Sequence, residues 1–266
     1  MAFCAPCRAI LLISALCSAL PAADRYDLLV EGAVDFELGP LLESLQSKHQ
    51  FQIGSWTYWT GRIGAKSVVV ARTEQGPINA AASTAFAIDR FHPAAIVNQG
   101  TSGAHNPDFQ VFDIVLGAST TDFSGYRSIH KDPGAGIDVT QWTPMPHSLR
   151  IGGGGLRAFP SFPGDPALLA AARATPYDKG RLRVGTIGSA YSFNRQIDFA
   201  RWVRQTFGTD SEDMESAYAA GVATGMQIPF LAVRIISNSE YNHPTLDPAS
   251  GTYCAQFVVD LIRSLK

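Results

Sequence analysis

Residues 26–38 read YDLLVEGAVDFEL, and this stretch sets the class of fold. The apolar run over residues 26–34 is typical of a buried strand, and the amphipathic stretch over residues 38–48 predicts a helix. The sharp turn between them presents Asp35 and Glu37 at the end of the strand. Because the same alternation recurs to the end of the chain, we predict helices packed on a largely parallel sheet.

Apolar runs and amphipathic stretches predict the remaining elements. Strands are expected at residues 26–34, 56–63, 67–72, 94–98, 114–118, 182–187 and 230–236. Helices are expected at residues 38–48, 78–91, 166–174, 199–206, 216–224 and 253–265. Residues 56–72 look like an antiparallel excursion from the sheet. The segment over residues 120–166 is rich in Pro and Gly, which predicts an irregular loop near the site or an oligomer contact.

Composition and charge narrow the class of protein. Of the 266 residues, 46% are hydrophobic and 17% are charged, which is typical of a globular domain. The 21 basic and 23 acidic residues leave a net charge of −2 without a dense Lys/Arg run, so no nucleic acid is expected as a partner. The six histidines lack a metal-ligand spacing, and no metal or other cofactor is implied.

The first 23 residues have the pattern of a secretory signal peptide. Arg8 precedes an apolar run over residues 9–20, and Pro21-Ala22-Ala23 supplies small residues before a cleavage point. We therefore expect residues 24–266 to form one exported domain, periplasmic or secreted. The apolar run is too short to span a bilayer, so no stable membrane insertion is expected after its removal. Cys254 would then be the lone cysteine, a small core residue in an apolar helix.

Three further segments carry polar or small residues beside predicted strands and helices. Residues 98–104 read NQGTSGA, where backbone N–H groups can approach a ligand closely. Residues 212–217 read EDMESA and place carboxylates at the start of an Ala-rich helix, either as caps or as ligand contacts. Residues 234–240 read RIISNSE and end a buried strand in polar groups. Ligands of open α/β sheets bind at the carboxyl ends of strands, so a shared site is expected there.

The order and spacing of these segments resemble the methylthioadenosine/S-adenosylhomocysteine nucleosidase family of the nucleoside phosphorylase superfamily, from about residue 28 to 265. Residues 32–37, GAVDFE, match the family's Gly-Ala-Met-x-x-Glu pattern. Residues 98–103 match its Asn-x-Gly-Ser/Thr-x-Gly turn, and Met214 with Glu215 matches its Met-Glu pair. The resemblance implies an α/β, three-layer nucleoside phosphorylase-like fold with a central mixed sheet flanked by helices. It also implies a hydrolase that cleaves a purine nucleoside.

The resemblance assigns roles to residues of this chain. Glu37 would activate water, and Glu215 would hold the ribose hydroxyls while Met214 packs against the sugar. Tyr191, with Phe193 as the alternative, would stack on the base. The substrate-binding set is completed by Asn98, Gly100, Thr101 and Arg234.

Asn238 is the sharpest departure from the family, which has an Asp that protonates the leaving purine at this position. An Asn cannot donate a titrating proton, but its amide can accept from a protonated N7 and donate to a 6-oxo group. This chemistry favours 6-oxopurine bases over adenine and puts methylthioadenosine in doubt as the substrate. Glu240, two residues on, is the alternative acid.

Two alternatives to a hydrolase follow from the same resemblance. A phosphorylase needs cations around phosphate, and Arg72 is the one candidate ligand, with a tethering role in its loop as the other interpretation. Residues 152–155, GGGG, follow no clear strand and carry no Lys-Ser/Thr, so a flexible loop is favoured over a phosphate cradle. A non-catalytic nucleoside-binding or storage relative is the second alternative. A homodimer is expected, with Ile137, Trp142 and Met145 in an apolar patch.

Overall fold

The computed structural model describes residues 25–266, and the signal-peptide prediction lies outside these residues. The strands are β1 (Leu28–Gly32), β2 (Gln46–Ile53), β3 (Trp56–Ile63), β4 (Lys66–Arg72), β5 (Ala95–Ala104), β6 (Ile114–Asp122), β7 (Tyr126–Arg127), β8 (Thr143–Pro144), β9 (His147–Arg150), β10 (Leu156–Phe159), β11 (Phe162–Pro163), β12 (Leu182–Ser189), β13 (Ser211–Asp213) and β14 (Phe230–Asn238). The helices are α1 (Gly39–Ser44), α2 (Pro77–Phe91), α3 (Pro166–Ala174), α4 (Ile197–Phe207), α5 (Ser216–Gly225) and α6 (Ala249–Ser264), with 3₁₀ turns η1 (Asp35–Glu37) and η2 (Val139–Gln141).

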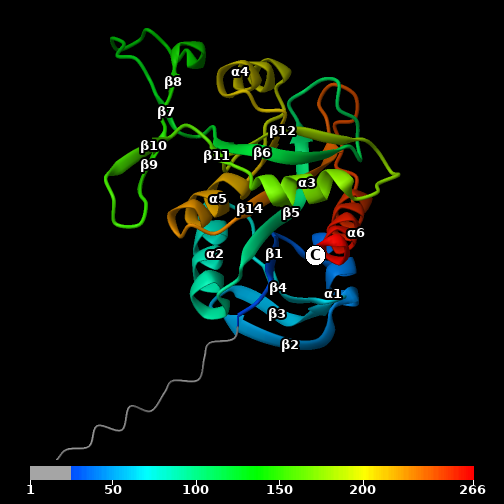
Figure 1. The fold of residues 1–266 in the computed structure, drawn as a ribbon. Coiled ribbons are helices and arrows are strands. Elements are labelled where there is room, and N and C mark those ends of the chain that lie inside the picture. Colours follow the sequence, from blue (N-terminus) through cyan, green and yellow to red (C-terminus); the bar gives the residue numbers. More distant parts are fainter. Residues whose placement is uncertain (1–24) are drawn as a thin grey trace, which may run out of the picture.

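A ten-stranded mixed sheet forms the middle layer of the domain (Figure 1). Its order is β11-β6-β12-β13-β5-β1-β4-β3-β2, and β14 pairs with both β5 and β6. The four central strands are parallel to one another: β1 pairs with β4 and with β5, and β5 pairs with β14. Parallel strands end at the same edge of a sheet, so the polar segments that follow β1 and end β14 come together with the end of β5.

Helices cover both faces of the sheet, which confirms the predicted three-layer α/β fold. Leu28 and Val30 of β1 face the cluster that contains α1, α3 and α6, whereas Leu29 faces the cluster that contains α2 and α5. Strands covered on both faces are buried along their whole length, as β1 and β14 are, although each also contains a buried charged residue, Glu31 or Arg234. Cys254 is buried in the first cluster, as expected of a small core residue. No helix in residues 25–266 has the length and apolar character needed to cross a membrane.

Several boundaries of strands and helices differ from those predicted from the sequence. The helix predicted over residues 38–48 ends at Ser44, and β2 begins at Gln46. The side chains of β2 are largely exposed, so no buried apolar pattern announces this edge strand. Its antiparallel pairing with β3 defines it instead. Residues 98–104 were predicted as a turn, but β5 runs through them to Ala104, because β14 pairs with β5 as far as Gly103.

Residues 124–160 project from the domain as a lobe rather than one irregular loop (Figure 1). Two short ladders, β7–β8 and β9–β10, give it structure. Trp142 stacks on Tyr126 with ring centroids 4.3 Å apart, so part of the apolar surface predicted here is used within the lobe. Ile137 remains 86% exposed. The GGGG segment over residues 152–155 forms the connection between β9 and β10.

Candidate active site

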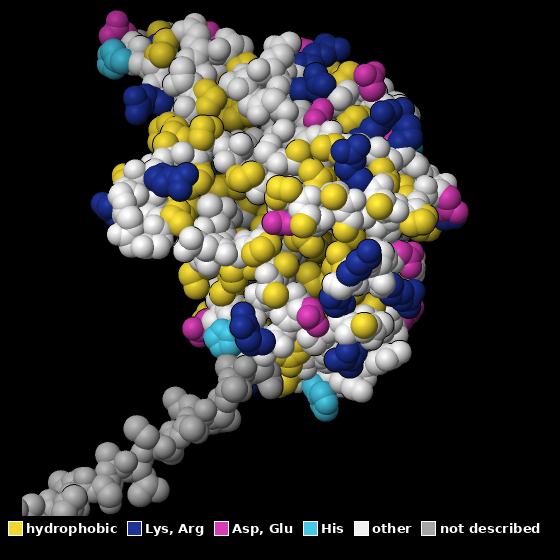
Figure 2. Space-filling model, viewed as in Figure 1, with side chains coloured by type: hydrophobic (Ala, Val, Ile, Leu, Met, Phe, Trp, Pro, Cys, Tyr) yellow, Lys and Arg dark blue, Asp and Glu magenta, His cyan; other side chains and the backbone are white. Residues whose placement is uncertain are grey.

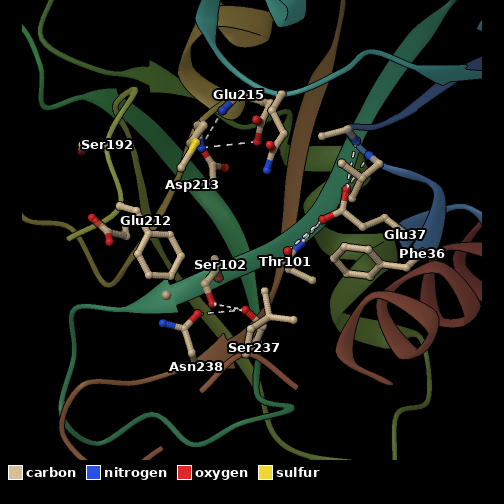
Figure 3. A pocket seen from close by; sticks show the side chains of 17 residues that line it. Phe36, Glu37, Thr101, Ser102, Ser192, Glu212, Asp213, Glu215, Ser237 and Asn238 are labelled. Carbon is tan, nitrogen blue, oxygen red and sulfur yellow. Dashed lines mark hydrogen bonds between the residues drawn. The ribbon is translucent and has the colours of Figure 1, made fainter. Parts of the chain in front are cut away.

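A cleft of about 670 Å³ opens where β1, β5, β13 and β14 end (Figure 3). The lining residues come from every segment that the sequence singled out, and they are Ala33, Val34, Phe36, Glu37, Gln75, Thr101, Ser102, Gly103, Ser192, Phe193, Glu212, Asp213, Met214, Glu215, Ser237, Asn238 and Leu246.

Glu37 is held at one end of the cleft by hydrogen-bond donors on both carboxylate oxygens. Its Oε1 accepts from the backbone N–H and the hydroxyl of Thr101, each at 2.8 Å, and its Oε2 accepts from the backbone N–H of Ala33 at 2.9 Å. Gly100 permits this approach, since a Cβ there would lie 2.8 Å from Glu37 Oε1. The Glu37 side chain is therefore a fixed acceptor that faces the cleft, and its Oε2 also has a longer contact of 3.4 Å with the backbone N–H of Val34, the N-cap of η1.

Glu215 lies beside Glu37 in the cleft, and its role as a helix cap was the wrong alternative. Although Glu215 occupies the N-cap of α5, its side chain makes no cap hydrogen bond there. Asp213 accepts the backbone N–H of Ser216 instead, at 3.1 Å. The Oε1 atom of Glu215 accepts from the backbone N–H of Gly76 at 2.9 Å. Burial, followed by the nearby charge of Asp213, raises the pKa of Glu215 to about 7.

Arg234 and Asn98, predicted as substrate contacts, instead lie behind the cleft and do not line it. Arg234 Nη2 donates to Asn98 Oδ1 at 2.6 Å. Arg234 Nε lies 2.7 Å from Asp213 Oδ2, close enough for an ion pair but off-axis for a hydrogen bond. Asn98 Nδ2 donates to the carboxylate of Glu31. Burial raises the pKa of Glu31 to about 6. Arg234 Nη2 also lies 3.9 Å from Glu215 Oε2. Arg234 and Asn98 thus act as positioning groups for Asp213 and Glu215 in the cleft wall.

The other end of the cleft carries Asn238 and an aromatic ring. Phe193 lines the cleft and is 58% exposed, whereas Tyr191 is 72% exposed and lies over Gly76 outside the lining residues. Of the two rings named for base stacking, Phe193 is the one that borders the cleft. Glu240 also lies outside the lining set, because its carboxylate pairs with Arg195 at 3.3 Å.

Glu212 is a lining residue to which sequence reasoning assigned no role. Its carboxylate takes hydrogen bonds from the Asn194 side-chain amide at 2.6 Å and from His105 Nε2 at 3.0 Å. The cluster of acidic residues at 212–215 was the available signal, but alternation along a strand could not be read from three residues. All four residues line the cleft, and the pairing of β13 with β5 places Glu212 opposite Gly103.

Comparison with known proteins assigns the family. The model of the phosphorylase superfamily matches residues 27–257. The chain belongs to this superfamily. A 5′-methylthioadenosine/S-adenosylhomocysteine nucleosidase of Oceanobacillus iheyensis is 25% identical over 241 residues, covering 88% of this chain and 97% of the relative. One from Bacillus licheniformis is 28% identical over 213 residues, covering 79% of this chain and 84% of the relative.

Solved structures of this superfamily share the fold. The Neisseria meningitidis nucleosidase in complex with methylthio-immucillin-A superposes with a TM-score of 0.73 at 22% identity, covering 90% of this chain and 99% of the other. The S-adenosylhomocysteine nucleosidase of Streptococcus pyogenes, in complex with 5-methylthiotubericidin, gives 0.72 at 21% identity, covering 92% and 99%. Within this superfamily member, the residues predicted at the family's motif positions, Glu37, Thr101, Met214, Glu215 and Asn238, line one cleft.

Proposed function

We propose that this protein hydrolyses the N-glycosidic bond of purine nucleosides. The observation that carries the proposal is the convergence of Glu37 and Glu215, from opposite ends of the sequence, on one cleft that also holds Phe193 and Asn238. Curated relatives that cover most of the chain are named as nucleosidases, which supports the same reaction.

The chemistry follows from the positions of these groups. Glu37 takes a proton from water, and the water oxygen bonds to C1′ as the bond from C1′ to N9 of the base breaks. The sugar develops positive charge in this step, and a carboxylate nearby stabilises that charge. Glu215 accepts hydrogen bonds from the ribose hydroxyls, while Met214 packs against the sugar and Phe193 packs against the base. The electron pair of the broken bond leaves with the purine, which takes a proton at N7 from solvent, and Glu37 afterwards returns the proton of the attacking water to solvent.

Hydrolysis is favoured over phosphorolysis by the charges around the cleft. Among the described residues that line it, none is a lysine or an arginine. Arg72, the candidate phosphate ligand, lies outside this set and pairs with Asp35 and Glu74, each at 2.9 Å. Its cation is already neutralised by two carboxylates, so the tethering role fits it better.

Incubation of the purified protein with a panel of purine nucleosides, with and without phosphate, tests this proposal. We expect free base and free sugar at a rate independent of phosphate. Formation of a sugar 1-phosphate would show a phosphorylase instead. Binding of nucleosides without any turnover would favour the non-catalytic alternative.

We also propose a homodimer. An apolar groove runs between α5 and the lobe, lined by Leu149, Phe162, Val222 and Met226 among others. Figure 2 shows hydrophobic side chains across the centre of this face. Nearby on α2, Ile78 is 82% exposed. A second copy is the occupant that suits an apolar surface of this kind. Sedimentation that shows only monomer at micromolar protein would contradict the dimer.

Export to the periplasm or the medium is proposed from residues 1–23 alone, through their basic, apolar and small-residue regions. Cell fractionation followed by mass spectrometry of the mature N-terminus tests it. A cytosolic protein that retains Met1 and its neighbours would contradict export.

A further inference from the structure

Three neighbouring strands bring Glu212, Gly103 and Asn238 into register at one end of the cleft. Glu212 of β13 pairs with Gly103 of β5, and Asn238 of β14 pairs with Gly103 from the other side. Side chains opposite one another in a ladder point to the same face of the sheet. Because Gly103 has no side chain, a slot is left between the carboxylate and the amide. Figure 3 shows Glu212 and Asn238 on this side of the cleft, away from Glu37.

The amide of Asn238 and the carboxylate of Glu212 border the same space beside Gly103. A Cβ built on Gly103 would lie 3.5 Å from Asn238 Nδ2 and 3.6 Å from Glu212 Oε1. A bulge in β14 sets this arrangement, since Ile236 pairs with Ser102 and Asn238 with Gly103, leaving Ser237 as the extra residue. Bulges of this kind re-aim side chains beside functional sites.

The carboxylate of Glu212 is fixed by its neighbours in a way that leaves one oxygen for a ligand. Oε2 takes the two strong contacts, from His105 Nε2 and the Asn194 side chain. A carboxylate can only accept, so His105 Nε2 carries the hydrogen that Glu212 receives, and His105 Nδ1 lies 2.7 Å from the hydroxyl of Thr209. Oε1 has a single, longer contact of 3.3 Å from the backbone N–H of Asn194.

The amide of Asn238 contacts Ser237. The Ser237 hydroxyl lies 3.0 Å from Asn238 Oδ1 and 3.2 Å from the carbonyl oxygen of Ser102, so its one hydrogen is shared between two acceptors. The donor end, Nδ2, then faces the slot. The slot therefore offers a hydrogen-bond donor on one side and an anionic acceptor on the other.

We propose that Glu212 is a specificity-determining residue that, together with Asn238, selects a 6-oxopurine base. This inference rests on the proposed nucleosidase function. A 6-oxopurine presents its O6 acceptor directly beside its N1–H donor, so Asn238 Nδ2 donates to O6 and Glu212 Oε1 accepts from N1–H. Adenine carries a lone pair at N1 in place of that hydrogen, and this lone pair would face the carboxylate. A site built to hydrogen-bond one group discriminates strongly against the analogue that lacks it.

Inosine and adenosine test the proposal, since they differ at position 6 and in the hydrogen on N1. We expect the wild-type protein to have a kcat/KM at least about tenfold higher for inosine. Glu212→Gln keeps the shape, removes the charge and supplies an amide that can donate to N1 of adenine. It should move the ratio of the two kcat/KM values toward adenosine by about tenfold. Glu240→Gln is the matched control, because its carboxylate lies outside the cleft, and it should leave the ratio unchanged.

Gly103→Ala tests the slot independently of charge. The added methyl group would have its nearest contacts at 3.4 to 3.6 Å, which is ordinary van der Waals distance, so the fold should tolerate it. The methyl group would occupy the space assigned to the base, and hypoxanthine should bind at least about tenfold more weakly. Unchanged hypoxanthine binding by this variant, or an equal loss on both nucleosides in Glu212→Gln, would overturn the proposal.

Calorimetry with the free bases separates this inference from the proposed reaction. If the wild-type protein cleaves neither nucleoside but binds hypoxanthine more tightly than adenine, and Glu212→Gln removes that preference, the proposed hydrolysis fails while the assignment of Glu212 stands. If adenine binds as tightly as hypoxanthine to the wild-type protein, the assignment of Glu212 fails whatever the activity.

Discussion

The two ends of the cleft are built in different ways. At the end with Glu37 and Glu215, backbone N–H groups of Ala33, Thr101 and Gly76 hold the carboxylates. At the end with Asn238 and Glu212, the main contacts come from side chains. Most donors at the first end are backbone groups, joined by the Thr101 hydroxyl, and backbone donors persist whatever the side chains are, so the first end keeps the family's pattern. The second end can change its partners by substitution, and there Asn238 departs from that pattern.

The largest effect is expected for Glu37→Gln. A Gln keeps the shape of Glu37 but cannot take the proton of water, so kcat should fall by about 10²- to 10⁴-fold while nucleoside binding changes little. Single-turnover kinetics and calorimetry with the same nucleoside measure the two effects. A parallel loss of affinity would show that Glu37 serves binding rather than proton transfer.

Asn238→Asp is the corresponding change at the other end of the cleft. An Asp can accept from a 6-amino group and share a proton with N7, but it loses the amide donor for a 6-oxo group. The preference should move toward 6-amino purines by about 1–3 kcal/mol, the cost of an unpaired buried acceptor. The ratio of kcat/KM for inosine and adenosine reports this shift. A wild-type protein that already cleaves methylthioadenosine faster than inosine would contradict this role of Asn238.

The pH dependence of kcat/KM sharpens the role of Glu215. Its pKa is about 7, and only the ionised carboxylate can accept from both ribose hydroxyls. Activity should therefore fall as pH falls through 7, by about tenfold at one pH unit below the pKa. Glu31→Gln is a useful control, since Glu31 is buried outside the cleft. Removal of its charge should leave the fall of kcat/KM below pH 7 unchanged. A flat profile between pH 6 and 8 would contradict the role of Glu215.

The smallest effect is expected for Glu240→Gln. Its carboxylate pairs with the 63% exposed side chain of Arg195 and does not reach the cleft, so kcat/KM should change by less than about twofold. Steady-state kinetics at the pH optimum measure it. A large loss would restore Glu240 as the source of the proton for the leaving base.

Much of the site could be predicted because its first end depends on local sequence. The turn after β1 lets the Glu37 carboxylate accept a hydrogen bond from the backbone N–H of Ala33, four residues away. A contact this local can be predicted from the residue types in the turn. Tyr191 and Phe193 could not be separated in the same way. They lie two residues apart in a segment without regular structure, so only its path decides which ring lines the cleft.

By itself, the sequence determined the alternation of buried strands and amphipathic helices, the turn that presents Glu37, and the Met214-Glu215 pair, since these depend on neighbours along the chain. Tertiary structure alone decided that Arg234 and Asn98 lie behind the cleft and that Glu212 faces Asn238 across Gly103. The reason is strand register. Pairing between β13, β5 and β14 joins residues more than 100 positions apart, and a shift of one residue would turn each side chain to the other face of the sheet.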